Sequence, residues 1–256
     1  MFQTPWRRWR RRQLAKKQMP VHWEPLIEER LSFAADMDQE ERKVWLEHLK
    51  IFAGEKNFEG IRLELTDEMR VVISGCAARL SRHIGFEVYD RLHSILVYPN
   101  SIALERTSGE GPLAHEKLVE VLGLHNSNGA VILSWDDVEK GLRFPHDGHD
   151  VALHELAHVI DASDGAHDGT PILSRSADYS AWARVFSESF ARLQESPRKH
   201  PVDDYGATNE AEFFATATEA FFEKPKRMLA KEPELYEQLC SYYGLDPAKN
   251  ANRPNL

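Results

Sequence analysis

The chain has 256 residues, of which 42% are hydrophobic and 29% are charged. This length supports one sizeable core, or one domain with a small appendage, and the composition excludes a disordered chain. No apolar run approaches the roughly 20 residues that a membrane span requires. The two cysteines, Cys76 and Cys240, are too few for a disulfide scaffold or a cysteine-rich zinc module, and they favour a reducing compartment.

The formal net charge of −9 conceals a strongly basic start. Residues 1–18 carry five arginines, two lysines and no acid, and no apolar segment follows them as it would in a secretory signal. We predict that residues 1–19 form a flexible basic tail. This tail could make weak contact with a membrane or another anionic surface through its charges and through Trp6 and Trp9. The acidic remainder of the chain argues against direct nucleic-acid binding as the main function.

Hydrophobic spacing predicts the elements of the N-terminal half. Helices are expected over 38–52 and 66–84. Strands are expected at "FEVY", at "HSILVYPN" (His93–Asn100) and at "GAVILSW" (Gly129–Trp135). Between the last two, "TSGEGPLAH" (Thr107–His115) has two glycines without phosphate-loop spacing, so we predict a mobile loop there.

The C-terminal half reads as helical. Helices are predicted over 150–162, 176–194, 209–223 and 233–243, the last with Pro233 in its first turn and Gly244 just past its end. A few strands followed by several helices indicate an α+β domain, with a small mixed sheet packed on helices. We predict one domain over 20–256, with residues 20–90 as a candidate N-terminal subdomain.

The stretch "HDVALHELAHVIDASDG" (His149–Gly165) carries the clearest chemistry. On a helix its apolar residues form a core-facing stripe, while His154 and His158, four residues apart, can converge on one metal ion. Glu155 lies beside them, within reach of a water bound to that ion. The alternative is two surface histidines that share this spacing by chance. The metal interpretation is favoured because the polar positions interrupt an otherwise apolar helix.

Zinc needs a third protein ligand, and the residues leave alternatives. A longer motif would place this ligand at Asp164, but it needs a glycine where this chain has Asp161. Glu212 and Glu219 lie two turns apart on a predicted helix rich in phenylalanine, where a buried carboxylate calls for a cation. Glu212 could instead complete a capping box with Asn209. Glu219 could be a surface charge or a partner of a ligating histidine.

Two resemblances narrow this choice. "HELAHVID" followed by "YGATNEAEFFA" (Tyr205–Ala215) resembles the catalytic domain of anthrax lethal factor, a zinc metallopeptidase. That resemblance implies that Glu212 completes the zinc site and that Tyr205 assists catalysis. "GAVILSWDDVEKG", "PHDGHDVALHELAHVID" and "NEAEFFATATEAFF" are similar to the Mlc titration factor A family, over roughly residues 20–250. This similarity implies a zincin-like fold and a cytoplasmic zinc peptidase that also binds Mlc, the repressor of glucose phosphotransferase genes.

The expected function is therefore zinc-dependent hydrolysis of peptide bonds. One zinc ion would be held by His154, His158 and Glu212, and Glu155 would act as general base. An extended substrate could pair along the edge of the strand at Gly129–Trp135. Aminopeptidase and endopeptidase activity both remain open. The contrasting interpretation is a non-catalytic protein that sequesters the repressor and keeps a structural or relic zinc site.

Overall fold

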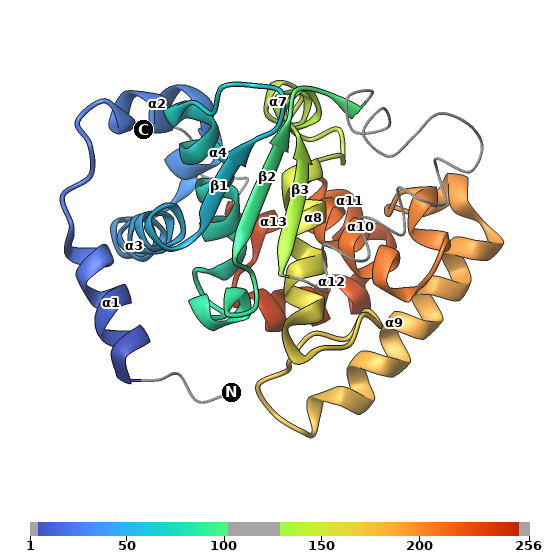
Figure 1. The fold of residues 1–256 in the computed structure, drawn as a ribbon. Coiled ribbons are helices and arrows are strands. Elements are labelled where there is room, and N and C mark those ends of the chain that lie inside the picture. Colours follow the sequence, from blue (N-terminus) through green and yellow to red (C-terminus); the bar gives the residue numbers. More distant parts are fainter. Residues whose placement is uncertain (1–4, 102–128, 251–256) are drawn as a thin grey trace. The chain divides into compact units, whose positions relative to one another are not determined.

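The computed structural model describes residues 5–101 and 129–250 (Figure 1). The predicted loop at Thr107–His115 lies outside the described residues. Contacts group the chain into two compact units, Met1–Leu142 and Arg143–Leu256, which are described separately below. The division predicted from the sequence, one domain over 20–256, stays a prediction. Among the described helices, none is both long enough and apolar enough to cross a membrane.

The first unit contains a small sheet in the order β1-β2-β3, formed by Asn57–Gly60, Ser94–Tyr98 and Ala130–Ser134. Both described pairings are parallel, with Ile95 opposite Phe58 on one side and opposite Val131 on the other. Over the described strands, the expected mixed sheet is thus corrected to a parallel one. A helix lies between β1 and β2 in sequence, and such a crossover returns the chain in the same direction. No described strand covers the other edge of β3, and substrate pairing along that edge stays a prediction.

Helices of this unit pack beside the sheet, and two of them have side-chain caps (Figure 1). Asp38 forms a capping box at the start of α3, and Thr66 accepts a hydrogen bond from Met69 N at the start of α4. The two helices pack closely, and the Trp45 indole donates to the carbonyl of Gly75 at 2.9 Å. The helices are α1 (Pro5–Lys16), α2 (Trp23–Arg30), α3 (Gln39–Glu55), α4 (Asp67–Ser81) and α7 (Trp135–Arg143).

The prediction of a strand at "FEVY" is wrong. Phe86–Tyr89 forms a 3₁₀ helix, in which residues three apart lie on the same side. Phe86 and Tyr89 are both buried, and the Tyr89 hydroxyl donates to the Ala77 carbonyl at 3.0 Å. A four-residue stretch with three apolar or aromatic side chains is therefore compatible with a single turn against α4 as well as with a strand.

The prediction of a flexible tail at residues 1–19 is also corrected. Pro5–Lys16 forms helix α1, which packs against α3. Arg11 on this helix is only 5% exposed and donates two hydrogen bonds of 2.7 Å to Glu55. The many positive charges of this segment predict a solvated tail from the sequence. In the folded unit, however, two of the arginines face acidic partners.

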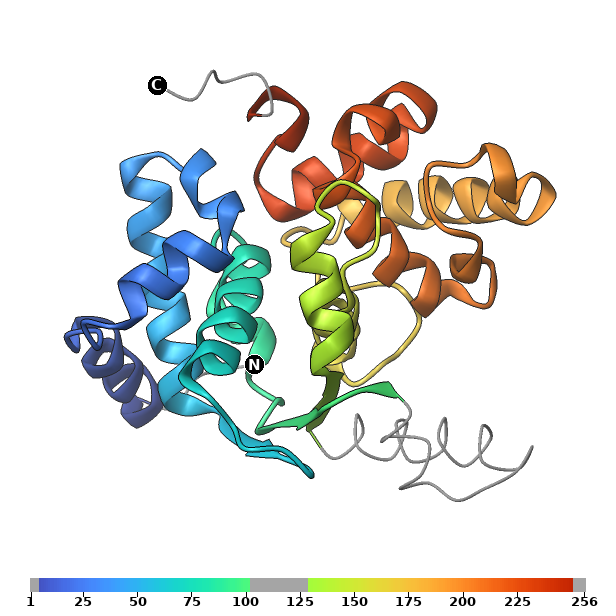
Figure 2. The ribbon, with the colours of Figure 1, turned by 90° about the horizontal axis from the view of Figure 1, so that it is seen from above.

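The second unit is helical over its described residues (Figure 2). The predicted helices are found within a few residues of their expected bounds. Helices α8 and α10 pack against each other, and α10 contributes the buried rings of Phe213, Phe214 and Phe221. The helices are α8 (Val151–Asp161), α9 (Asp178–Glu195), α10 (Glu210–Glu223), α11 (Pro225–Lys231), α12 (Pro233–Tyr243) and α13 (Pro247–Asn250).

Candidate metal centre

Helix α8 is fixed at both its start and its apolar face. Asp150 caps it, because its carboxylate accepts a hydrogen bond of 3.0 Å from Leu153 N. The predicted apolar stripe is fully buried, and it consists of Leu153, Leu156, Ala157 and Ile160. This packing turns the intervening polar positions away from the core toward α10, so that His154 and His158 face a second helix instead of bulk water.

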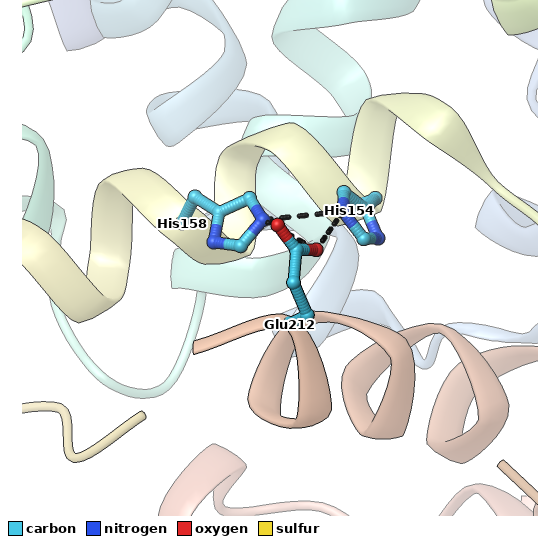
Figure 3. Close-up of side chains that lie close together, drawn as sticks. All are labelled: His154, His158 and Glu212. Carbon is cyan, nitrogen blue, oxygen red and sulfur yellow. Dashed lines mark hydrogen bonds and ion pairs between the residues drawn. The ribbon is translucent and has the colours of Figure 1, made fainter. Parts of the chain in front are cut away.

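His154, His158 and Glu212 meet between α8 and α10 (Figure 3). The two Nε2 atoms of the histidines are 3.1 Å apart. Glu212 Oε2 lies 3.1 Å from His154 Nε2 and 3.2 Å from His158 Nε2. Three donor atoms therefore form a nearly equilateral triangle, and each comes from a residue type that binds zinc.

The size of this triangle fits a zinc ion. For bonds of about 2.0–2.1 Å in a tetrahedral site, neighbouring donor atoms are about 3.3–3.4 Å apart. The separations of 3.1–3.2 Å found here need only a slight expansion. Two imidazole nitrogens and one carboxylate also match catalytic zinc sites, which keep a fourth position for water or substrate.

Glu219 orients His154 from behind. Its Oε1 lies 2.7 Å from His154 Nδ1, and its Oε2 accepts a 2.7 Å hydrogen bond from the backbone N–H of Asp150. With its Nδ1 proton directed to a carboxylate, the imidazole keeps Nε2 aimed at the centre, where loss of the Nε2 proton would free a lone pair for a metal ion. The sequence alone allows Glu219 to be either a surface charge or a hydrogen-bond partner of a ligating histidine. The cap at Asp150 was not predicted. An aspartate directly before the apolar run was the available signal.

The backbone N–H and the side-chain carboxylate of Glu212 have different partners, which distinguishes the two alternatives for this residue. Its backbone N–H donates to Asn209 Oδ1 at 2.9 Å, so Asn209 does cap α10. Its carboxylate turns to the histidines instead of closing a capping box. The cap thus fixes the first turn of α10, and the first turn places the carboxylate opposite α8.

The longer motif that would use Asp164 finds no support in the geometry. Asp164 is exposed and lies outside the group formed by the three donors. Asp161, at the position where a glycine would turn the chain, continues α8 with a helical φ of −55°. It is buried and accepts a hydrogen bond from Gly169 N at 3.1 Å, so it anchors the loop after α8.

Glu155 follows His154 on α8 and is partly buried. Burial raises the pKa of this carboxyl, an effect opposed by His154 and His158 and reinforced by the charges of Glu212 and Glu219. Its carboxylate accepts no hydrogen bond from the described part of the chain. A carboxylate that has a raised pKa and no hydrogen-bond donor among the described residues has the properties required of a proton acceptor.

The turn that carries Tyr205 packs tightly against α10. Tyr205 lies in the 3₁₀ helix Asp204–Ala207, and its ring centroid is 6.0 Å from that of His154. A Cβ at the buried neighbour Gly206 would lie 2.3 Å from Thr216 Oγ1 on α10. Gly206 is therefore required for the close packing of this turn against α10. The Tyr205 ring is 55% exposed.

The charged groups of the centre shift the pKa values of one another. Burial disfavours the charged form of His154, but hydrogen bonds with Glu212 and Glu219 prevail and raise its pKa to about 10. Burial likewise opposes ionisation of Glu212, while His154 and His158 lower its pKa to about 2. The pKa of Tyr205 is raised by burial and by the nearby carboxylates of Glu212 and Glu155. The phenol therefore keeps its proton and can donate a hydrogen bond.

Comparison with known proteins covers both units. A family model described as glucose-regulated metallo-peptidase M90 matches residues 6–244. An uncharacterized protein of Synechocystis is 36% identical over 251 residues, which are 96% of this chain and 91% of that protein. A protein named Mlc titration factor A from Cronobacter sakazakii is 26% identical over 257 residues, 96% of this chain and 93% of its own. A protein of the same name from Escherichia fergusonii is 26% identical over 205 residues, covering 77% and 76%.

Proposed function

The chain belongs to the glucose-regulated metallo-peptidase family M90, and on this basis we propose that it hydrolyses peptide bonds with one zinc ion held by His154, His158 and Glu212. The resemblance to Mlc titration factor A is confirmed by the relatives of that name. The observation that carries the proposal is the triangle of donor atoms between α8 and α10. A His-Glu-x-x-His helix facing a glutamate on a later helix is a zincin-like arrangement.

The residues around the triangle have different proposed roles in hydrolysis. A zinc ion bound there supplies a Lewis acid that polarises the scissile carbonyl and acidifies a water. Glu155 takes the proton from the attacking water at its carboxylate and passes it to the nitrogen of the leaving amine. The raised pKa of Glu155 suits both steps, because the protonated form must be accessible near neutral pH.

Tyr205 is proposed to stabilise the oxygen on which negative charge develops. Its phenol is neutral and lies beside the His154 ring. A donor about 3 Å from the developing oxyanion stabilises the transition state more than the ground state. Glu219 acts through His154, since it fixes the orientation of that ring without touching the substrate.

We also propose that the protein binds an Mlc-type transcription repressor in the cytoplasm. The support is the name of the relatives in Cronobacter and Escherichia, which describes titration of Mlc. Both free cysteines are compatible with a reducing compartment. Peptide hydrolysis and repressor binding are separate properties, and loss of one need not remove the other.

The test of the proposed activity uses a mixed peptide library and the full-length chain. Protein treated with a chelator should lose hydrolysis, and one equivalent of zinc per chain should restore it. The cleavage products identify aminopeptidase or endopeptidase action. Zinc-loaded protein that cleaves no peptide in the library, yet binds the repressor, would contradict the proposal and favour a sequestering protein.

A further inference from the structure

Helix α1 has one face anchored in the first unit by acidic partners. Arg11 pairs with Glu55 through two hydrogen bonds of 2.7 Å and with Asp90 at 2.7 Å. Arg7, one turn earlier, donates to the Asp90 carbonyl at 3.0 Å. Leu14 packs so tightly on α3 that a Cβ at Gly54 would meet it at 2.6 Å. Residues at positions 7, 11 and 14 lie on one face of a helix, so this face is fixed against the unit.

The opposite face carries aromatic rings and cations without acidic partners. Trp6 and Trp9 are 64% and 58% exposed. Arg12 and Lys16, which continue the same face at helical spacing, are also exposed. Neither cation forms an ion pair with any other described residue. Two large exposed indoles next to uncompensated positive charge are unusual on a protein whose formal net charge is −9.

We propose that this outward face of α1, formed by Trp6, Trp9, Arg12 and Lys16, docks on an anionic lipid bilayer. Indole rings favour the headgroup level of a membrane, where one edge is apolar and the other is hydrated. Lysine and arginine next to them attract anionic lipid, each contributing about 1 kcal/mol near the surface. The salt bridges of Arg7 and Arg11 keep the helix on the protein, so that the bilayer receives a preformed face.

An alternative anionic partner is nucleic acid, and the observations favour lipid over it. A nucleic-acid site needs many phosphate contacts and a basic domain, whereas the sequence outside residues 1–18 is strongly acidic. The two indoles are exposed on one short helix, whereas binding of a single strand uses a basic groove along several nucleotides. A short basic face with two indoles therefore matches weak, reversible association with a membrane surface.

The test is co-sedimentation of the zinc-loaded, full-length chain with vesicles. Vesicles of phosphatidylcholine alone are compared with vesicles that also contain phosphatidylglycerol. We expect binding to the anionic vesicles only, falling as salt is raised. Arg12→Gln with Lys16→Gln should lower the partition coefficient about 25-fold, as expected for two charges near the surface. Trp6→Gln with Trp9→Gln should abolish binding.

A matched control removes the same charge elsewhere. Lys199→Gln with Lys231→Gln changes two exposed lysines of the second unit and should leave vesicle binding unchanged. Melting temperature and peptide hydrolysis should be unaffected in all three double variants. Absence of binding to anionic vesicles, or an equal loss in the control, would overturn the proposal. Binding to duplex DNA that is tighter than binding to the anionic vesicles, and that depends on the same α1 residues, would also overturn the proposal. It would assign this face to nucleic acid.

Discussion

Two glutamates of α10, seven residues apart, approach the same imidazole from different sides. Glu212 faces His154 Nε2, while Glu219 faces His154 Nδ1. Only the first carboxylate shares an atom with the donor triangle. The second is nearly buried and also accepts the Asp150 N–H. One residue type at two helical positions thus has two different sets of contacts, which we propose are those of a metal ligand and of an orienting group.

This difference predicts an order of zinc affinities. Glu212→Ala removes a proposed ligand and should lower zinc affinity more than Glu219→Ala. The latter should weaken zinc binding by about 10- to 100-fold, as for other orienting groups. Titration with a competing chelator measures both, and Glu210→Ala, an exposed position of the same helix, serves as the control. A larger loss in the Glu219 variant would make Glu219 the ligand.

A second prediction concerns the Tyr205 hydroxyl. Tyr205→Phe should lower kcat and kcat/KM together by about 10²-fold, because the lost donor acts in the transition state. Zinc content and melting temperature should not change, since the ring stays and is 55% exposed. Steady-state kinetics on a peptide identified from the library measures this. Wild-type turnover in the variant would remove Tyr205 from the mechanism.

The residues of the candidate site were predictable to different degrees. His154 and His158 follow from a four-residue spacing, which a helix converts directly into proximity. Glu212 lies more than fifty residues later and was assigned by resemblance, because its residue pattern fits a capping box as well. The partnership of Glu219 with Asp150 depends on how α8 and α10 pack, and no local pattern encodes that packing.

At the level of elements, Gly206 couples the turn of Tyr205 to α10. Gly206→Ala should cost about 1–3 kcal/mol of folding free energy, as expected for overpacking, because the new Cβ would collide with Thr216 Oγ1. Turnover should fall as well, since Tyr205 moves with the turn. Adding Thr216→Ala removes the obstructing hydroxyl and should recover part of the stability. Urea unfolding compares the variants, and equal stability of the single variant and wild type would contradict the close approach.

A second prediction about elements concerns the docking of α1. Arg11→Ala removes the cation that the buried carboxylates of Glu55 and Asp90 share, and leaves only Lys56 beside Glu55 and Arg7 beside Asp90, which should cost up to about 3–5 kcal/mol. Arg12→Ala, at the exposed neighbouring position, should change stability by less than about 0.5 kcal/mol. Thermal unfolding of both variants gives the comparison. Similar melting temperatures would show that α1 is not held by this network.

Helices and strands could be predicted from the sequence where the capping residues and the hydrophobic period indicate the same element. The predicted helix at 209–223 matches α10, since Asn209 is a strong cap before an apolar run. Strand β1 (Asn57–Gly60) was missed because four residues with one buried side chain show no period. Helix α1 was missed because its anchoring depends on Glu55 and Asp90, which are distant in sequence.

For the whole molecule, buried carboxylates in both units predict loss of stability in acid. Burial opposes ionisation, but Arg11 and Lys56 lower the pKa of Glu55 to about 2. His200, Arg192 and Ser189 likewise lower the pKa of Glu232 to about 2. Each folded pKa lies below the ordinary value of 4.5, so each contribution is complete above pH 4.5 and is lost as pH falls toward 2.

Each of these two carboxylates contributes up to about 3 kcal/mol at neutral pH. Urea unfolding between pH 6 and pH 3 should therefore show a falling free energy. Glu232→Gln should flatten the slope, whereas Glu234→Gln, at an exposed position, should not. A free energy of unfolding that stays constant over this range would contradict the lowered pKa values.

All residues of the proposed centre belong to the second unit, Arg143–Leu256. The central claim is that they hold zinc and that Glu155 moves the proton. The most direct measurement is zinc content and peptide turnover of Glu155→Gln, with Glu210→Gln as the matched control. The account predicts about one zinc per chain in both variants, with turnover lowered by several orders of magnitude in Glu155→Gln only. Turnover of Glu155→Gln within about tenfold of wild type, with zinc retained, would contradict it.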